Sequence, residues 1–92
     1  MPTTDDDGRL EASVADDVLD SVREIVGRGK ATILPHHELK KDLGIDSLEF
    51  VRLVQVVEEN VDVLLGDEEA AKVVTVADLV ALTDEAVRKK AR

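Results

Sequence analysis

A regular pattern of apolar residues begins at Leu10. From there, apolar side chains recur every three or four residues as far as Val26, and acidic residues occupy most of the positions between them. This spacing places the apolar side chains on one face of an α-helix, because a helix turns once every 3.6 residues. Gly27 and Gly29 follow and are suitable stop signals for that helix. The predicted buried face comprises Leu10, Val14, Val18, Val22, Ile25 and Val26.

A second apolar stripe follows a helix-start signal at Asp46. Asp46 suits the N-cap position and Glu49 stands three residues later, so this capping-box pattern predicts a helix that begins at Ser47. The helix is apolar over much of its circumference and is therefore expected to pack against several neighbours. The stripe consists of Phe50, Leu53, Val54, Val57 and Val61, and Leu48 and Val51 are expected to widen it.

The segment between these two predicted helices, residues 28–45, indicates a long connection. It contains Pro35 and Gly44 together with several isolated apolar residues. A loop of this length in a small domain is usually functional or disordered. The apolar residues favour a loop that is pinned across the helices. These anchors are Ile33, Leu34, Leu39 and Leu43.

The last third of the chain predicts one short and one longer helix. Residues 67–72 suit one or two helical turns, and a final helix is expected from Thr75, with Asp78 at its capping-box position. Residues 61–64 and 73–76 are rich in valine and would also suit strands by propensity. The longer windows fit a period of 3.6 better than a period of 2, so we predict helices here.

Together these elements predict an all-α fold, a small bundle of three main helices plus one short helix, with a long loop between the first and second helices. Residues 1–9 are polar and are expected to form a flexible leader. Residues 10–88 would form the helical domain. Residues 89–92 would form a basic tail, whose positive charge suits the C-terminal end of a helix.

The amino-acid composition of the chain excludes several classes of function. The 92 residues include 21 acidic and 12 basic side chains, for a formal net charge of −9. Such a surface repels nucleic acid and anionic membranes and suits partners with basic docking faces. No cysteine is present to form a disulfide or a thiolate site. No apolar stretch approaches the ~20 residues that span a bilayer. We therefore expect a cytoplasmic monomer that neither binds nucleic acid nor inserts stably into membranes.

Residues 42–49, with the sequence Asp-Leu-Gly-Ile-Asp-Ser-Leu-Glu, carry the candidate chemistry. They predict a turn that leads into a helix N-terminus, with Ser47 at the first exposed position. Unpaired backbone N–H groups and a partial positive charge at such an end favour a phosphate group. Gly44 would allow the tight turn just before the serine.

These eight residues closely resemble the phosphopantetheine attachment motif of acyl carrier proteins, and the resemblance extends over about residues 10–88. It implies that Ser47, between Asp46 and Leu48, carries 4'-phosphopantetheine added from coenzyme A by a phosphopantetheinyl transferase. The thiol of that arm would hold acyl groups as thioesters while they pass between enzymes. The resemblance thus implies a carrier of fatty acid or polyketide-type biosynthesis, and a substrate and partner of enzymes.

The resemblance also implies that the second helix is the docking surface for partner enzymes, including acyltransferases and ketosynthases. Glu49, Glu58 and Glu59 match acidic positions of that surface, as does Asp46, which would also cap the helix. Arg52 departs from the family pattern, because an acidic residue is common at that position. This reversed charge favours a specialised carrier, such as one in polyketide synthesis.

Alternative interpretations of the same residues are weaker or remain open. Ser47 could simply cap a helix. It does not lie in the G-x-S-x-G pattern of a nucleophile elbow, and the adjacent His36 and His37 offer no triad, so no catalytic residue is predicted. Those histidines also lack further ligands at metal spacing, so no metal site is predicted. An aminoacyl or peptidyl carrier, or an unmodified acidic adaptor, remains a rival hypothesis.

Overall fold

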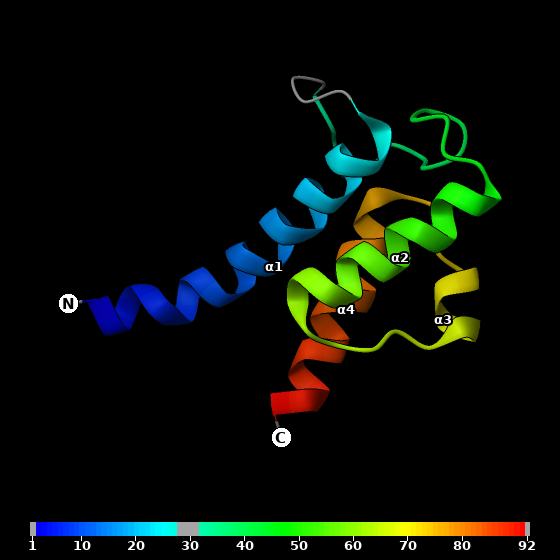
Figure 1. The fold of residues 1–92 in the computed structure, drawn as a ribbon. Coiled ribbons are helices and arrows are strands. Elements are labelled where there is room, and N and C mark those ends of the chain that lie inside the picture. The colour runs from blue at the N-terminus through cyan, green and yellow to red at the C-terminus, as the bar shows by residue number, and fades with distance from the viewer. Residues whose placement is uncertain (1, 28–31, 92) are drawn as a thin grey trace.

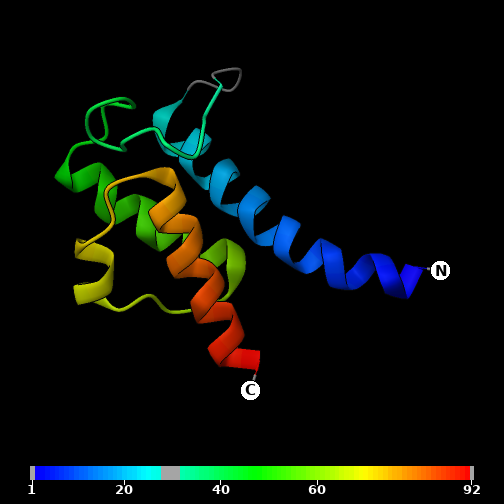
Figure 2. The ribbon, with the colours of Figure 1, turned by 180° about the vertical axis from the view of Figure 1, so that it is seen from behind.

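The computed structural model describes residues 2–27 and 32–91, and the side chains of residues 14–27 and 32–90. Four helices follow one another in the order α1 (Pro2–Val26), α2 (Ser47–Val61), α3 (Asp67–Ala71) and α4 (Val76–Ala91). The prediction of three main helices and one short helix is thereby confirmed. Helix α1 packs against both α2 and α4, and the short α3 lies against α4 (Figures 1 and 2).

The core is aliphatic and lies where α1, α2 and α4 meet. Its helical residues are spaced by three and four, as the apolar pattern predicts, and the loops add several more side chains. Phe50, the only aromatic residue, packs against this core while half-buried. The buried apolar residues of the cluster are Val14, Val18, Val22, Ile33, Leu39, Ile45, Leu53, Val57, Val63, Leu65, Val76 and Leu79.

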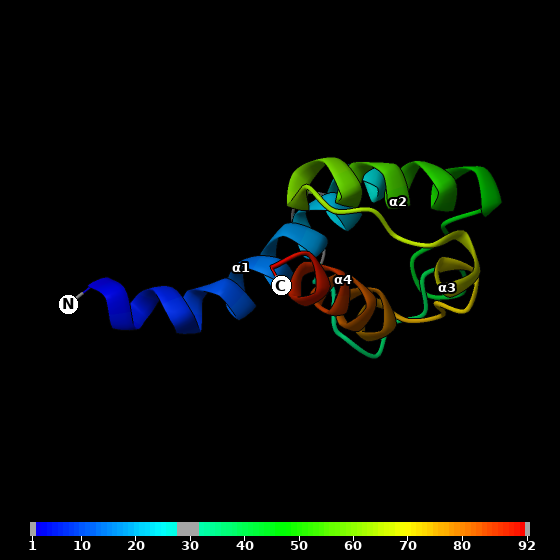
Figure 3. The same cartoon turned by 90° about the horizontal axis from the view of Figure 1, so that it is seen from below.

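The first helix begins at Pro2, whereas the apolar pattern predicted a start at Leu10. Proline suits the first turn of a helix, because its missing N–H would have no partner there in any case. This first half of α1 projects away from α2 and α4 (Figure 3). The backbone of the predicted leader is therefore helical in this structure, and its flexibility stays a prediction. Of the two predicted stop signals, Gly27 follows α1 directly with φ +75, and Gly29 lies outside the described residues.

The boundaries of α4 also differ from the prediction at both ends. The helix starts at Val76, because Thr75 is its capping residue: the Thr75 hydroxyl accepts the N–H of Asp78 at 3.1 Å. At the other end, residues 89–91 belong to α4, so the basic tail continues the helix up to Ala91. The valine-rich segments form no strand within the described residues, and Thr75 takes part only in an isolated bridge with Glu38.

The long connection is held against the start of α4 by backbone hydrogen bonds. The carbonyl oxygens of Pro35 and His37 accept the N–H groups of Ala77 and Val76, at 2.9 and 3.0 Å. These two donors lie in the first turn of α4, where a helix has no internal acceptors for its N–H groups. The described part of the loop therefore caps α4, which confirms that it is pinned. Of the predicted anchors, Ile33 and Leu39 are buried, but Leu34 is exposed, so its prediction as an anchor was wrong.

Three polar contacts complete the interior. Ser21, fully buried on α1, donates from its hydroxyl to the Asp17 carbonyl and accepts from the Asn60 amide, each at 2.8 Å. The second bond joins α1 to α2. Thr83, also fully buried, donates to the Leu79 carbonyl at 2.8 Å. Within the described residues no buried side-chain nitrogen or oxygen lacks a partner, as expected for a well-packed domain.

Candidate functional site

The turn before α2 is closed by hydrogen bonds from both backbone and side chain. The Asp42 carboxylate accepts the N–H of Glu38 at 2.7 Å, and the Glu38 carbonyl in return accepts the N–H of Asp42 at 2.9 Å. Gly44 then adopts φ +71, a conformation that costs glycine little. Ile45 follows and is 2% exposed, so it anchors the turn in the core. The next residues emerge at the surface in a fixed position.

The start of α2 is a complete capping box, as the sequence predicts. The Asp46 carboxylate accepts the N–H of Glu49 at 2.8 Å, and the Glu49 carboxylate accepts the N–H of Asp46 at 3.1 Å. Each bond satisfies a backbone donor that a helix end would leave unpaired. Both carboxylates are therefore engaged in holding the helix start.

Ser47 is the first residue of α2 and is exposed. Among the described residues no group accepts the N–H of Ser47 or of Leu48, because the capping box takes only the N–H of Glu49. These two donors and the helix dipole make this end attractive to a phosphate group. The residues present therefore fit a phosphodiester on the Ser47 hydroxyl.

The outer surface of α2 carries two exposed apolar residues beside Ser47. Leu48 is 79% exposed and Val51 is 53% exposed, while Leu53 and Val57 on the opposite face are fully buried. The expectation that Leu48 and Val51 widen the packing stripe is therefore wrong. Val51 lies two residues and Leu48 five residues before the buried Leu53, so at 3.6 residues per turn both point toward the opposite side of α2, where they are exposed.

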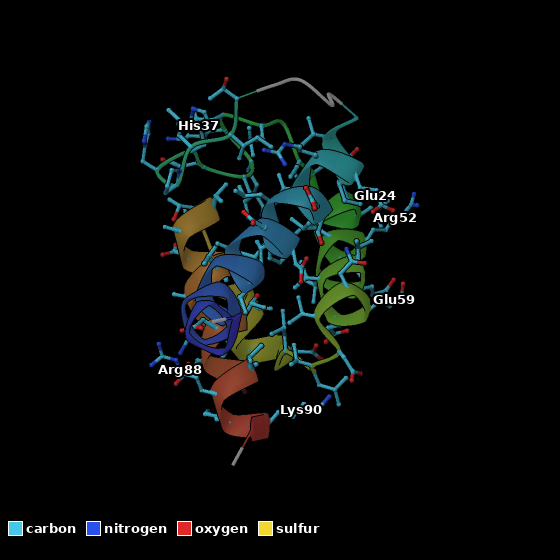
Figure 4. All side chains as sticks on the ribbon, turned by 90° about the vertical axis from the view of Figure 1, so that its left-hand side faces the viewer. Glu24, His37, Arg52, Glu59, Arg88 and Lys90 are labelled. Atoms are coloured by element: carbon cyan, nitrogen blue, oxygen red, sulfur yellow. The ribbon has the colours of Figure 1, made fainter. Side chains whose placement is uncertain are left out.

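The charged residues of α2 differ in how accessible they are to a partner protein. Arg52 and Glu59 are exposed and point outward from the helix (Figure 4). Glu58 is half-buried, and its carboxylate accepts the N–H of Leu65 at 2.9 Å, which fixes the chain after α2. Of Glu58 and Glu59, two of the three glutamates that the sequence offers for docking, Glu59 is the more available.

A hollow of about 870 Å³ lies at the far end of α2, between that end, residues 62–66 and α4. Its lining mixes apolar side chains, such as Val63 and Leu82, with charged ones. On its rim, Lys90 donates to the carboxylate of Asp62 at 2.8 Å and also to its carbonyl oxygen. Lys90 lowers the pKa of Asp62 by this hydrogen bond and by its charge. The hollow was not predicted from the sequence, because its walls come from separate elements.

The two histidines lie in the loop, away from any cluster of ligands. His36 is exposed, and the Nδ1 atom of His37 accepts the N–H of Leu34 at 3.1 Å. Their ring centroids are 5.0 Å apart, in an edge-to-face arrangement. In the part of the chain that the structure describes, no group of three or more histidine, aspartate or glutamate residues could hold a metal ion. In the same part, no helix is long and apolar enough to cross a membrane.

Comparisons with known proteins agree with this geometry. The family model described as "Phosphopantetheine attachment site" matches residues 16–83. The acyl carrier protein of an Exiguobacterium species is 40% identical to the chain over 65 residues, which cover 71% of this chain and 82% of the relative. The acyl carrier protein of Helicobacter pylori is 37% identical over 65 residues, which cover 71% and 83%.

The fold also matches a solved structure from Mycobacterium tuberculosis that is described as a candidate acyl carrier protein. The TM-score is 0.74, and the match covers 78% of this chain and 96% of the other at 22% identity, so it supports the fold alone. Taken with the family model and the two relatives, the chain belongs to the acyl carrier protein family. Members are carriers rather than catalysts, and the cofactor is 4'-phosphopantetheine.

Proposed function

We propose that Ser47 is the residue that carries 4'-phosphopantetheine, and that the protein shuttles acyl intermediates between biosynthetic enzymes. The observation that carries this proposal is the position of Ser47: exposed, first in α2, and within the residues that the family model matches. The preceding capping box holds the helix end rigid, so a modifying enzyme would meet a fixed hydroxyl. When attached, the arm supplies the thiol that this cysteine-free chain lacks.

Attachment requires a simple group transfer. The Ser47 oxygen bonds to the phosphorus of coenzyme A that bears the pantetheine, and the bond from that phosphorus to the pyrophosphate bridge breaks. Adenosine 3',5'-bisphosphate leaves, and the serine proton passes to a base of the phosphopantetheinyl transferase. The chain itself provides the exposed hydroxyl and the free N–H groups of Ser47 and Leu48, which would stay beside the new phosphodiester.

For the pathway, we favour polyketide-type over fatty acid biosynthesis, because Arg52 places a positive charge on the exposed surface of α2. The partners would be acyltransferases and ketosynthases, with Glu49, Arg52, Glu58 and Glu59 as the candidate contact residues. We place the protein in the cytoplasm as a monomer. An aminoacyl or peptidyl cargo is the alternative within carriers, and an unmodified adaptor is the alternative outside them.

The test is the intact mass after incubation with coenzyme A and a broad phosphopantetheinyl transferase. The wild type is expected to gain the mass of one phosphopantetheine, and Ser47→Ala none. Thr32→Ala, which removes another exposed hydroxyl, is the matched control and should be loaded like the wild type. Circular dichroism should show the same helix content in all three proteins.

Two results would contradict the proposal in different ways. If Ser47→Ala were still loaded, the attachment site would lie elsewhere. If the wild type gained no mass while a known carrier was loaded beside it, the adaptor alternative would be favoured.

A further inference from the structure

Lys90, in the last turn of α4, reaches across to the chain that leaves α2 (Figure 4). Its ammonium group donates to the Asp62 carboxylate at 2.8 Å and also to the Asp62 carbonyl oxygen. We call these two hydrogen bonds the Lys90 clasp. The two residues are 28 positions apart in the sequence, so the clasp ties the end of α2 to the end of α4. Lys90 also lies beyond residue 83, where the match to the family model ends.

The backbone of Asp62 is held in place by the end of α2. Asp62 follows the last residue of that helix and adopts φ 61 and ψ 51, a left-handed conformation that aspartate tolerates better than most residues other than glycine. Its N–H donates to the Glu58 carbonyl at 2.8 Å. The carbonyl groups at a helix C-terminus carry partial negative charge, which favours a cation beside them. The end of α2 therefore presents a carboxylate and a carbonyl oxygen together to Lys90.

The clasp lies on the rim of the hollow between the end of α2, residues 62–66 and α4, and the apolar lining of that hollow is largely covered. Val63 and Leu65 are buried, and Leu82 of α4 is half-buried. Direct packing of α2 against α4 is sparse, whereas each of them packs more extensively against α1. The clasp thus joins two helix ends that have little other contact with each other.

The remaining charges around the hollow would push its walls apart. Carboxylates come from α2, α3 and α4, and like charges that face one another across a hollow repel. Lys90 opposes this repulsion by placing a cation of α4 on a carboxylate at the end of α2. The acidic residues that line the hollow besides Asp62 are Glu58, Glu59, Glu69 and Glu85.

We propose that the Lys90 clasp is a gate, which holds the ends of α2 and α4 together and restricts access to the apolar lining of the hollow. When the clasp opens, repulsion between the carboxylates separates the two helix ends, and the last turns of α4 move away from residues 62–66. The gate does not require the modification of Ser47, so it goes beyond the proposed function. It can be tested on the unmodified protein.

The experiment uses an introduced cysteine as a probe of access, because the chain has no cysteine of its own. Leu82→Cys places the probe in the hollow, and Val80→Cys places a control probe at another half-buried position of α4, outside the hollow. The rate of modification by N-ethylmaleimide, a neutral reagent, is measured for each probe with and without Lys90→Gln. We expect Lys90→Gln to speed the modification of Leu82→Cys about two- to fivefold, the range of one exposed ion pair, and to leave Val80→Cys unchanged.

Lys89→Gln is the matched control for the loss of one positive charge. Lys89 also lines the hollow, but its ion pair with Glu85, at 3.9 Å, lies within α4. This variant is expected to leave both rates unchanged. Circular dichroism checks that each variant keeps its helix content, and Ala86→Cys, also in the lining, replaces Leu82→Cys if that variant does not fold.

Three results would overturn the gate. If Lys89→Gln speeds the modification in the hollow as much as Lys90→Gln does, the loss of any positive charge there is sufficient. If Lys90→Gln speeds the modification of Val80→Cys as well, it loosens the whole domain instead of opening the hollow. If the rate in the hollow does not change, the hollow is equally accessible without the clasp.

Discussion

Asp78 fixes the start of α4 through three hydrogen bonds. Its carboxylate accepts the N–H groups of Thr75 and Val74 at 3.1 and 3.0 Å, and its own N–H donates to the Thr75 hydroxyl. The two backbone donors lower the pKa of Asp78 below its ordinary value of 3.8. The charged form is therefore favoured by the folded protein more than by the unfolded chain.

This depressed pKa gives the folded protein a stability that depends on pH. The contribution is present above the unfolded pKa and is lost as pH falls through the lower pKa of the folded state. The unfolding free energy should fall as pH is lowered from 6 to 2.5, and we expect it to fall less in Asp78→Asn than in the wild type. Urea denaturation at both pH values measures the difference. Asp67→Asn, at an exposed aspartate of α3, is the control and should follow the wild type. An unchanged pH slope in Asp78→Asn would contradict this role.

A side-chain hydrogen bond could be predicted from the sequence where its donor and acceptor residues lie within one helical turn of each other. The capping box of Asp46 and Glu49 follows from their spacing of three residues, and so does the cap formed by Thr75 and Asp78. The bond from Leu65 to Glu58 could not be predicted, because it depends on how the chain folds back after α2. For the same reason, the sequence alone presented Glu58 as a surface residue equivalent to Glu59.

Among the elements, the loop before α2 contributes more to the fold than its lack of secondary structure suggests. Leu39 is 1% exposed, and its N–H donates to the Val74 carbonyl at 2.9 Å. The apolar residues in the loop predicted that it is anchored, but local spacing contains no information about distant partners such as Val74. The start of α1 was missed for a related reason: periodicity detects a buried face, and the first half of α1 extends beyond the bundle.

Replacing a buried leucine of the loop should therefore destabilise the whole domain. We expect Leu39→Ala to lower the unfolding free energy by about 2–5 kcal/mol, the usual cost of truncating a buried leucine to alanine. Leu48→Ala removes the same atoms from an exposed position and should change stability by less than about 0.5 kcal/mol. Thermal and urea unfolding of the two variants provide the measurement. Equal destabilisation would show that the loop is not part of the cooperative unit.

For the whole molecule, we expect repulsion between like charges to outweigh the attraction of the ion pairs within the described residues. Arg23 pairs with Asp20 at 3.0 Å and Lys90 with Asp62 at 2.8 Å, but these are exposed pairs, which typically contribute about 0–1 kcal/mol each. The net charge of −9 acts against compaction over the whole surface. Salt is therefore expected to weaken the repulsion between like charges more than it weakens the attraction within the ion pairs.

The melting temperature should accordingly rise between low and moderate salt. In a domain of this size, each 1 kcal/mol of relieved repulsion corresponds to roughly 4–8 °C. Calorimetry in NaCl and in KCl at matched ionic strength should give the same rise, since screening does not depend on the cation. A fall in melting temperature would mean that the ion pairs dominate.

The hydrogen bonds between the loop and α4 have a consequence for how the protein is made. The loop that leads to Ser47 is held by Val74, Val76 and Ala77, which are synthesised long after the serine itself. A growing chain on the ribosome that has not reached these residues has no partners for Pro35, His37 and Leu39. The loop before the serine is therefore held against the bundle only in a chain that includes residues 74–77, whereas the capping box lies within residues 46–49. A fragment that stops before α4 would present the serine on a loop that lacks these contacts. Recognition of the folded site would then restrict the use of coenzyme A to chains that include α4.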